Sequence, residues 1–236
     1  MDTIRKVGVF GDSILKGIQL DSKTKKYCVK NCIDLEKIGE KHSVSIDNFS
    51  MFGCTIHKGS IMLQRRLEKR AFDIVVLEYG GNDCDFNWKE ISERPYDKHI
   101  PNTPLMVFIE TYKNMINILR GKCIETIITT LPPLEPQRFF DWFCRDLNKD
   151  NILKWLGGVN TIYRFQEQYS HAIEYIAYET NTLLVDIRSA FLRNFRIDEL
   201  LCEDGAHPNS YGHQVITDVF LNFSKTNLNK MIWSKI

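Results

Sequence analysis

The feature that most constrains the fold is a series of short apolar runs, each ending in glycine or polar residues. The clearest is FDIVVLEYG, a nearly continuous β-branched run that stops at a glycine. Continuous apolar runs of this length are typical of strands that are covered on both faces. We expect five such strands, at residues 7–10, 43–49, 73–79, 125–130 and 182–187.

Helical patterns separate these runs. The stretch at 57–70 is amphipathic, and the stretch at 104–122 starts at a proline and ends near a glycine. Two further helices are expected at 160–181 and 209–228. Strands that alternate with helices predict an α/β fold with a parallel sheet. With no repeat, low-complexity tract or linker in 236 residues, we predict one domain over 1–236.

Composition excludes several classes of partner. The formal net charge of +1 provides no electrostatic basis for binding nucleic acid or an anionic membrane surface. The lysines in KTKKYCVK, residues 23–30, are interpreted as a solvated face. No run of 18 apolar residues is present, so we expect neither a membrane span nor a membrane partner.

The number and spacing of the cysteines and the length of the first apolar run indicate where the protein is located. The sequence has seven cysteines: Cys28, Cys32, Cys54, Cys84, Cys123, Cys144 and Cys202. Because the count is odd and no C-x-x-C pair occurs, we expect reduced thiols rather than a disulfide framework. The first apolar run is too short for a signal peptide and is needed as a strand. We therefore expect a cytoplasmic protein; the sequence leaves its oligomeric state open.

Two long connections, 84–103 and 131–158, interrupt the alternation of strands and helices. Each follows a predicted strand, and each is rich in phenylalanine and tryptophan, so neither has the composition of a disordered loop. The carboxyl ends of parallel strands are where ligands bind in open sheets. Both connections are therefore expected beside a ligand site.

Polar and glycine-bearing turns follow the predicted strands at the same edge. Gly11-Asp12-Ser13 follows the first strand, Gly53 the second, and GGND at 80–83 the third. Asp204 and His207, within EDGAHPN, lie between the fifth strand and the last helix. Each segment alone fits an ordinary turn, because turns favour these residues. Together at one edge of one sheet, they indicate a functional site.

These four segments resemble, in order, the blocks of the SGNH hydrolases, also called GDSL-type esterases. The blocks are GDS at 11–13, Gly53, GGND at 80–83 and DGAHP at 204–208, and the resemblance spans nearly the whole chain. The stretches GGNDCDFNW and DWFC…ILKWLG are similar to uncharacterised members from anaerobic Gram-positive bacteria. The resemblance implies a three-layer α/β/α sandwich around a five-stranded parallel sheet in flavodoxin-like order.

The resemblance also implies roles for the matching residues. Ser13 is the implied nucleophile, His207 the general base and Asp204 the residue that orients the base. The implied oxyanion hole consists of the N–H groups of Ser13 and Gly53 with the Asn82 amide. A helix following Ser13 is expected to direct its positive end toward the site.

The remaining polar residues near these blocks are interpreted as structural. Asp12 and Asp83 are expected to bond turn backbone, and His213 is expected to be packed. Cys54 and Cys84 are interpreted as small fillers that could be sites of thiol inhibition. Histidine and cysteine spacing matches no metal motif, so no metal and no cofactor is predicted.

For the substrate we expect a small ester carrying a short acyl group, acetyl above all, on a carbohydrate or similar alcohol. Aromatic residues lie beside polar ones in the two long connections, a mixture that suits sugar rings better than a fatty-acyl tunnel. The candidate substrate-binding residues are Trp88, Trp142 and Arg138.

Other functions stay open at this point. One is an acyl hydrolase of the lysophospholipase or thioesterase type, and another is a non-catalytic binding module on the same fold. A nucleotide-binding protein is disfavoured, because GDSILKG matches neither G-x-x-x-x-G-K-[ST] nor G-x-G-x-x-G. The segment also differs from the G-x-S-x-G elbow of α/β-hydrolases.

Overall fold

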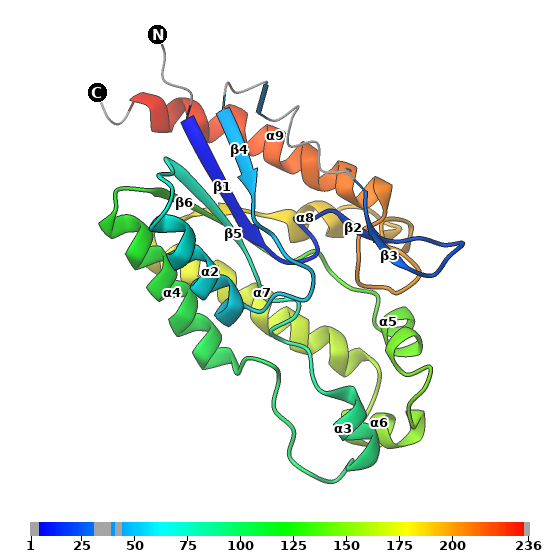
Figure 1. Ribbon diagram of the computed structural model, residues 1–236. Coiled ribbons are helices and arrows are strands. Elements are labelled where there is room, and N and C mark those ends of the chain that lie inside the picture. Colours follow the sequence, from blue (N-terminus) through cyan, green and yellow to red (C-terminus); the bar gives the residue numbers. More distant parts are fainter. Residues whose placement is uncertain (1–4, 31–38, 41–43, 234–236) are drawn as a thin grey trace.

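The computed structural model describes residues 5–30, 39–40 and 44–233, with side chains described as far as residue 225. Its centre is a five-stranded sheet in the order β4-β1-β5-β6-β7, with every neighbouring pair parallel (Figure 1). The strands are β1 Arg5–Gly11, β4 Val44–Asn48, β5 Ile74–Glu78, β6 Glu125–Thr129 and β7 Leu183–Val185.

This order confirms the predicted flavodoxin-like sheet. All five predicted strands are present, each within a few residues of the expected ends; Ser43, the first residue of the second prediction, lies outside the described residues. The central strand β5 has every residue buried, as its continuous apolar run requires.

Helices cover both faces of the sheet and make the three layers visible in Figure 1. Side chains of α2 Ile56–Leu67, α4 Leu105–Gly121 and α7 Asn160–Thr180 pack on one face, in a cluster centred on Phe10, Val75 and Leu77. On the other face, α8 Ile187–Leu192 and α9 Ser210–Trp233 pack against Val7, Val9 and Val76. Successive side chains of one strand therefore point to opposite faces of the sheet and pack into different cores.

The two long connections fold into a third core beyond the carboxyl edge of the sheet. The first contains α3 Trp88–Glu93, and the second contains α5 Pro136–Phe143 and α6 Lys149–Leu156. Their apolar side chains pack together with Ile162 of α7 in one buried cluster. These segments are therefore ordered by their own aromatic packing, as their composition predicted.

An antiparallel hairpin was not predicted. It consists of β2 Ile18–Leu20 and β3 Tyr27–Val29, and it extends from the end of β1 past the turn at 202–208 (Figure 1). Lys25, from the segment predicted to be a solvated lysine face, forms an ion pair with Glu203. The hairpin and the 202–208 turn are thus joined at the carboxyl edge of the sheet.

Candidate active site

Ser13 lies in a tight turn directly after β1. The Asp12 carboxylate accepts the N–H of Ile14 at 2.8 Å, and the Asp12 carbonyl accepts the N–H of Lys16 at 3.1 Å. Residues 13–17 are turns that lead into β2, so the helix expected after Ser13 is wrong. The cause is local: Gly17 adopts φ +75°, which ends the first turn and redirects the chain into the hairpin.

Ser13 meets His207 across the carboxyl edge of the sheet. Its Oγ lies 3.0 Å from Nε2 of His207, and Nδ1 of that ring lies 2.7 Å from Oδ2 of Asp204. All three are shielded, with Ser13 and Asp204 exposed by only 5% and 1%. Hydroxyl, imidazole and carboxylate therefore form one hydrogen-bonded line, which is the arrangement needed to withdraw a proton from the hydroxyl.

Asp204 is held as an anion by its hydrogen bonds. Burial alone would raise its pKa, but bonds from the His207 ring and from the N–H groups of His207 and Ala206 outweigh burial and lower the pKa. Those N–H groups donate to Oδ1 at 3.0 and 3.1 Å. The carboxylate is therefore fixed within its own turn and can orient the imidazole.

Tyr27 of the hairpin supplies a fourth hydrogen bond to Asp204. Its hydroxyl donates to Oδ2 at 2.9 Å, the same oxygen that contacts the His207 ring. Burial, followed by the Asp204 charge, raises the pKa of Tyr27 well above its ordinary value. The phenol therefore stays protonated and available as a donor.

Aromatic rings surround the exposed side of His207. The ring centroid of Tyr27 lies 4.9 Å from that of His207, and Phe52 stacks at 5.9 Å with planes 10° apart. Trp142 of α5 lies 6.3 Å from Tyr27. Phe52 is 54% exposed and Tyr27 37%. We call Tyr27, Phe52 and Trp142 the aromatic rim.

Asn82 lies beside Ser13 after β5. Its Nδ2 donates to Oδ2 of Asp12 at 2.8 Å, and its side chain faces the cavity described below. Gly53 adopts φ +66°, a conformation that favours glycine, and a Cβ added there would meet no atom within 4 Å. Asn82 lines the cavity whereas Gly53 lies next to Phe52 of the aromatic rim, outside that lining.

Glu78 is a buried acid that accepts a hydrogen bond from the Asp12 backbone. The sequence did not identify it as part of the site. It ends β5 with no exposed surface, and its Oε2 accepts the N–H of Asp12 at 3.1 Å. Burial and the adjacent Asp12 charge raise the pKa of Glu78 well above 4.5, and burial also raises the pKa of Asp12. The only signal in the sequence was a charged residue inside the apolar run IVVLEYG.

The other polar neighbours have structural contacts. Asp83 accepts the N–H of Ile56 at 3.0 Å and the Thr103 hydroxyl at 2.6 Å, so it joins three segments. His213 is fully buried with Nε2 3.4 Å from the Ile18 carbonyl, and burial lowers its pKa to about 4. Asp83 and His213 are thus packed within the protein, as predicted.

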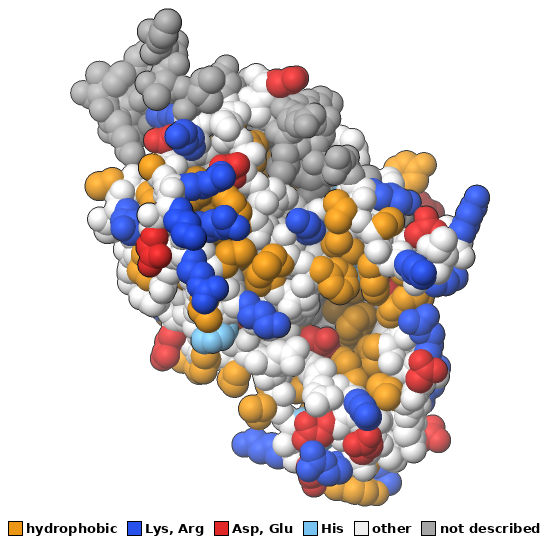
Figure 2. Space-filling view, viewed as in Figure 1, with side chains coloured by type: hydrophobic (Ala, Val, Ile, Leu, Met, Phe, Trp, Pro, Cys, Tyr) orange, Lys and Arg blue, Asp and Glu red, His pale blue; other side chains and the backbone are white. Residues whose placement is uncertain are grey.

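A cavity of about 170 Å³ opens beside Ser13. Asp12, Asn82 and His207 form its polar end, and apolar side chains from α7 and the two long connections form most of its wall. That wall contains Trp88, Leu131, Pro132, Leu134, Phe139, Ile162 and Phe165. Figure 2 shows apolar side chains gathered in a hollow between the β2–β3 hairpin and α5. A site with a reactive hydroxyl at one end and a small apolar chamber at the other suits a short acyl group.

The three residues predicted to bind substrate have different surroundings. Trp88 lines the cavity, but it is 8% exposed, stacks on Phe143 at 4.2 Å and donates its N–H to Asp85 at 2.7 Å. Trp142 belongs to the aromatic rim, and the Arg145 guanidinium lies 3.5 Å from its ring centroid.

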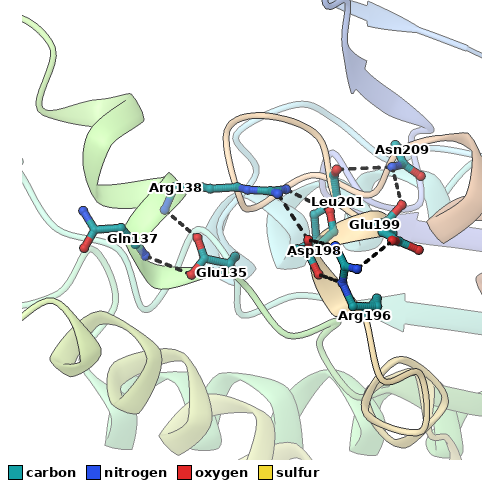
Figure 3. Close-up of polar contacts among 8 residues, drawn as sticks. All are labelled: Glu135, Gln137, Arg138, Arg196, Asp198, Glu199, Leu201 and Asn209. Atoms are coloured by element: carbon teal, nitrogen blue, oxygen red, sulfur yellow. Dashed lines mark hydrogen bonds and ion pairs between the residues drawn. The ribbon is translucent and has the colours of Figure 1, made fainter.

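Arg138 does not line the cavity. It extends from α5 and donates to the Asp198 carbonyl at 2.8 Å (Figure 3). In the same network, Arg196 contacts Asp198 and Glu199, and Asn209 donates to the carbonyl of Glu199. Arg138 therefore ties α5 to the segment that precedes Asp204 and His207.

In the described part of the chain, neither a metal-binding cluster nor a membrane-spanning helix is present. No group of three or more histidine, cysteine, aspartate or glutamate side chains with metal-binding geometry occurs there. None of the helices described is both long and apolar enough to cross a bilayer.

The fold and the site define an α/β protein with the architecture of an acyl hydrolase. A family model for GDSL-like lipases and acylhydrolases matches residues 9–215, so the chain belongs to the GDSL-like lipase/acylhydrolase family. The resemblance seen in the sequence is thereby confirmed, and the protein is an ester hydrolase. A comparison with curated proteins gave no match.

Solved structures share the fold. A lipase/acylhydrolase from Enterococcus faecalis is 22% identical, with TM-score 0.65 over 94% of this chain and 96% of that one. The enzyme LAE5, from the metagenome of Lake Arreo, is 20% identical, with TM-score 0.65 over 94% and 95%. Axe2, an acetylxylan esterase from Geobacillus stearothermophilus, is 20% identical, with TM-score 0.63 over 94% and 95%.

Proposed function

We propose that the protein hydrolyses short-chain acyl esters, acetyl esters above all, of a carbohydrate or similar polyhydroxylated alcohol by a Ser-His-Asp mechanism. The observation that carries the proposal is the hydrogen-bonded line from Ser13 through His207 to Asp204, at 3.0 and 2.7 Å, beside a cavity of about 170 Å³.

In the proposed first step, Oγ of Ser13 attacks the ester carbonyl carbon while Nε2 of His207 takes the hydroxyl proton. The carbonyl oxygen becomes an oxyanion, which the N–H groups of Ser13 and Gly53 and the Asn82 amide stabilise. Asp12 holds that amide at 2.8 Å, so the donor is oriented before substrate arrives. Asp204 stabilises the imidazolium that forms.

In the second half, His207 returns its proton to the leaving alcohol, and the acyl group stays on Ser13. Water then attacks the acyl-enzyme with His207 again acting as base, which releases the acid and restores Ser13. No metal takes part in this sequence of steps.

The size of the cavity supports a short acyl group. An apolar cavity of roughly 150 Å³ accommodates one benzene molecule, so a cavity of about 170 Å³ matches a short acyl group better than a fatty-acyl chain. Two partly exposed rings of the aromatic rim contact His207, the residue that would donate a proton to the leaving alcohol, which supports a ring-shaped alcohol.

The comparison with Axe2 points the same way. That protein, described as an acetylxylan esterase, has been solved as catalytic mutants in which a serine, an aspartate or a histidine is replaced by alanine. The aspartate lies three positions before the histidine, the spacing of Asp204 and His207 here.

Replacement of the nucleophile tests the mechanism. Ser13→Ala should fold normally and lose roughly a thousandfold or more in kcat. A fluorophosphonate should label Ser13 in the native protein, as measured by peptide mass spectrometry. A chelator should leave the activity unchanged. Substantial turnover by the alanine variant, labelling at another serine or inhibition by the chelator would each contradict the mechanism.

A series of p-nitrophenyl esters tests the acyl preference and the long-chain alternative. In an open apolar channel each added methylene contributes roughly 0.8 kcal/mol, so kcat/KM would rise several-fold per carbon, as in a lysophospholipase. We expect kcat/KM to fall beyond acetyl or butyryl as the chain meets the cavity wall. A steady rise to octanoyl would refute the short-acyl assignment, and no hydrolysis of any ester would favour a binding module.

A further inference from the structure

Asp204 uses the full accepting capacity of its carboxylate. Oδ1 accepts two backbone N–H groups, and Oδ2 contacts both Nδ1 of His207 and the Tyr27 hydroxyl. A carboxylate offers about four lone-pair directions, so Tyr27 fills the last of them. Hydrogen bonds to a buried charge are stronger than those between neutral groups. The hydroxyl of Tyr27 is thus part of what holds the carboxylate against the imidazole.

The hairpin fixes Tyr27 in this position. Tyr27 pairs with Leu20 in the β2–β3 ladder, and Lys30 donates its N–H to the Gly17 carbonyl at 3.0 Å. Lys25 pairs with Glu203, the residue next to Asp204. The segment that follows the Ser13 turn therefore forms the hairpin, and the hairpin places the Tyr27 hydroxyl against Asp204.

The ring of Tyr27 has a second contact surface. Its centroid lies 4.9 Å from His207, 5.2 Å from Phe52 and 6.3 Å from Trp142, so Tyr27 contacts the imidazole and both other members of the aromatic rim. The three rings are partly exposed and contiguous, and contiguous apolar patches on a protein surface often mark binding sites. Under the proposed mechanism His207 returns its proton to the leaving alcohol, so that alcohol must lie beside the imidazole that these rings contact.

We propose that Tyr27 serves two purposes at once: its hydroxyl positions Asp204, and its ring, with Phe52 and Trp142, forms a subsite for a ring-shaped alcohol. The inference rests on the proposed function, and it assigns the alcohol side of the site to the hairpin and α5. The chemical class is a sugar ring, whose C–H face packs on aromatic rings while its hydroxyls remain hydrated.

Two variants separate the two purposes. Tyr27→Phe keeps the ring and removes the hydroxyl, whereas Tyr27→Leu removes both. Each is assayed on two acetyl esters, ethyl acetate and a tetra-acetylated pentose, so that the acyl group is constant and only the alcohol differs. Tyr178→Phe and Tyr178→Leu are the matched controls, because Tyr178 is 86% exposed on α7.

We expect Tyr27→Phe to lower kcat about tenfold on both esters with KM unchanged, since one hydrogen bond to a charge is lost. Tyr27→Leu should show the same loss in kcat and, on the sugar ester alone, a several-fold higher KM. A merely structural role would lower the melting temperature of both variants and leave kcat and KM of the folded protein unchanged on both esters. The Tyr178 variants should match the native protein in every measurement.

The outcomes distinguish this proposal from the proposed function. A native protein whose Ser13 is not labelled by a fluorophosphonate overturns both. Normal labelling together with native kcat for Tyr27→Phe overturns the positioning role alone. An equal change in KM on the two esters for Tyr27→Leu overturns the sugar subsite.

Discussion

The N–H of Glu135 donates to the carbonyl of Gly205 at 2.8 Å, so the start of α5 is bonded to the turn that carries Asp204 and His207. Gly205 has φ +70°, and a Cβ added there would lie 2.6 Å from the Glu135 carbonyl oxygen. The second long connection and the candidate active site are therefore one packed unit, joined at a position where only glycine fits.

The first prediction concerns that position. Gly205→Ala should destabilise the protein by about 1–3 kcal/mol through its backbone conformation, with a further cost from the contact with Glu135. It should also lower kcat, because the turn must shift. Urea unfolding and ester hydrolysis measure the two effects. Gly121→Ala is the control, since a Cβ there meets nothing within 4 Å and φ is ordinary; a native-like Gly205→Ala would contradict the packing.

Asn82 provides the second prediction. If its amide stabilises the oxyanion, Asn82→Ala should lower kcat about a hundredfold with little change in KM, because the interaction is made in the transition state. Steady-state kinetics on p-nitrophenyl acetate checks this. A raised KM with unchanged kcat would mean that Asn82 binds the ground state of the substrate instead.

The buried acid below Asp12 makes stability depend on pH. The pKa of Glu78 lies well above 4.5 in the folded protein because of burial and the neighbouring Asp12 charge. Above pH 4.5 the unfolded chain has released this proton while the native protein keeps it, so stability falls as pH rises until the folded pKa is passed.

Glu78→Gln removes this titration and can still accept the Asp12 N–H. Its free energy of unfolding should therefore fall less than that of the native protein between pH 5 and pH 8, as measured by urea unfolding. Glu68→Gln, an exposed position at the end of α2, should follow the native curve. Parallel curves for Glu78→Gln and the native protein would show that Glu78 ionises normally.

Trp88 and Trp142 should differ in their effects on stability. Trp88 is enclosed in the core of the two long connections, so Trp88→Ala should cost about 3–5 kcal/mol and leave the Asp85 carboxylate without its indole donor. Trp142 is only partly buried, and Trp142→Ala should cost much less. Unfolding curves with comparable midpoints for the two variants would refute this distinction.

Much of the fold could be predicted because the strands are apolar runs separated by amphipathic helices. The run at 73–79 became β5, the centre of the sheet, and the helices predicted at 57–70 and 104–122 lie within three residues of the ends of α2 and α4. Polar residues after successive strands then had to meet at one edge, which brought Ser13, Asn82 and His207 together.

What could not be predicted depends on contacts between distant residues. The hairpin was missed because β2 and β3 have three residues each and derive their order partly from contacts such as Tyr27 with Asp204, 177 positions away. Arg138 was predicted to bind substrate, and its partner Asp198 lies 60 positions away. The composition of the two long connections indicated that aromatic and polar residues lie near the site. Tertiary packing determines which of their side chains face the cavity.

The hydrogen bond between Ser13 and His207 joins residues 194 positions apart. During synthesis, a chain that has emerged to residue 200 contains the serine, the asparagine and all five strands of the sheet but lacks His207, the base that would activate the hydroxyl. Such long-range closure is slow compared with local helix formation. Under the proposed mechanism, hydrolysis begins only when the turn at 202–208 reaches the end of β1, so recovery of activity after denaturation would report when these two distant segments come together.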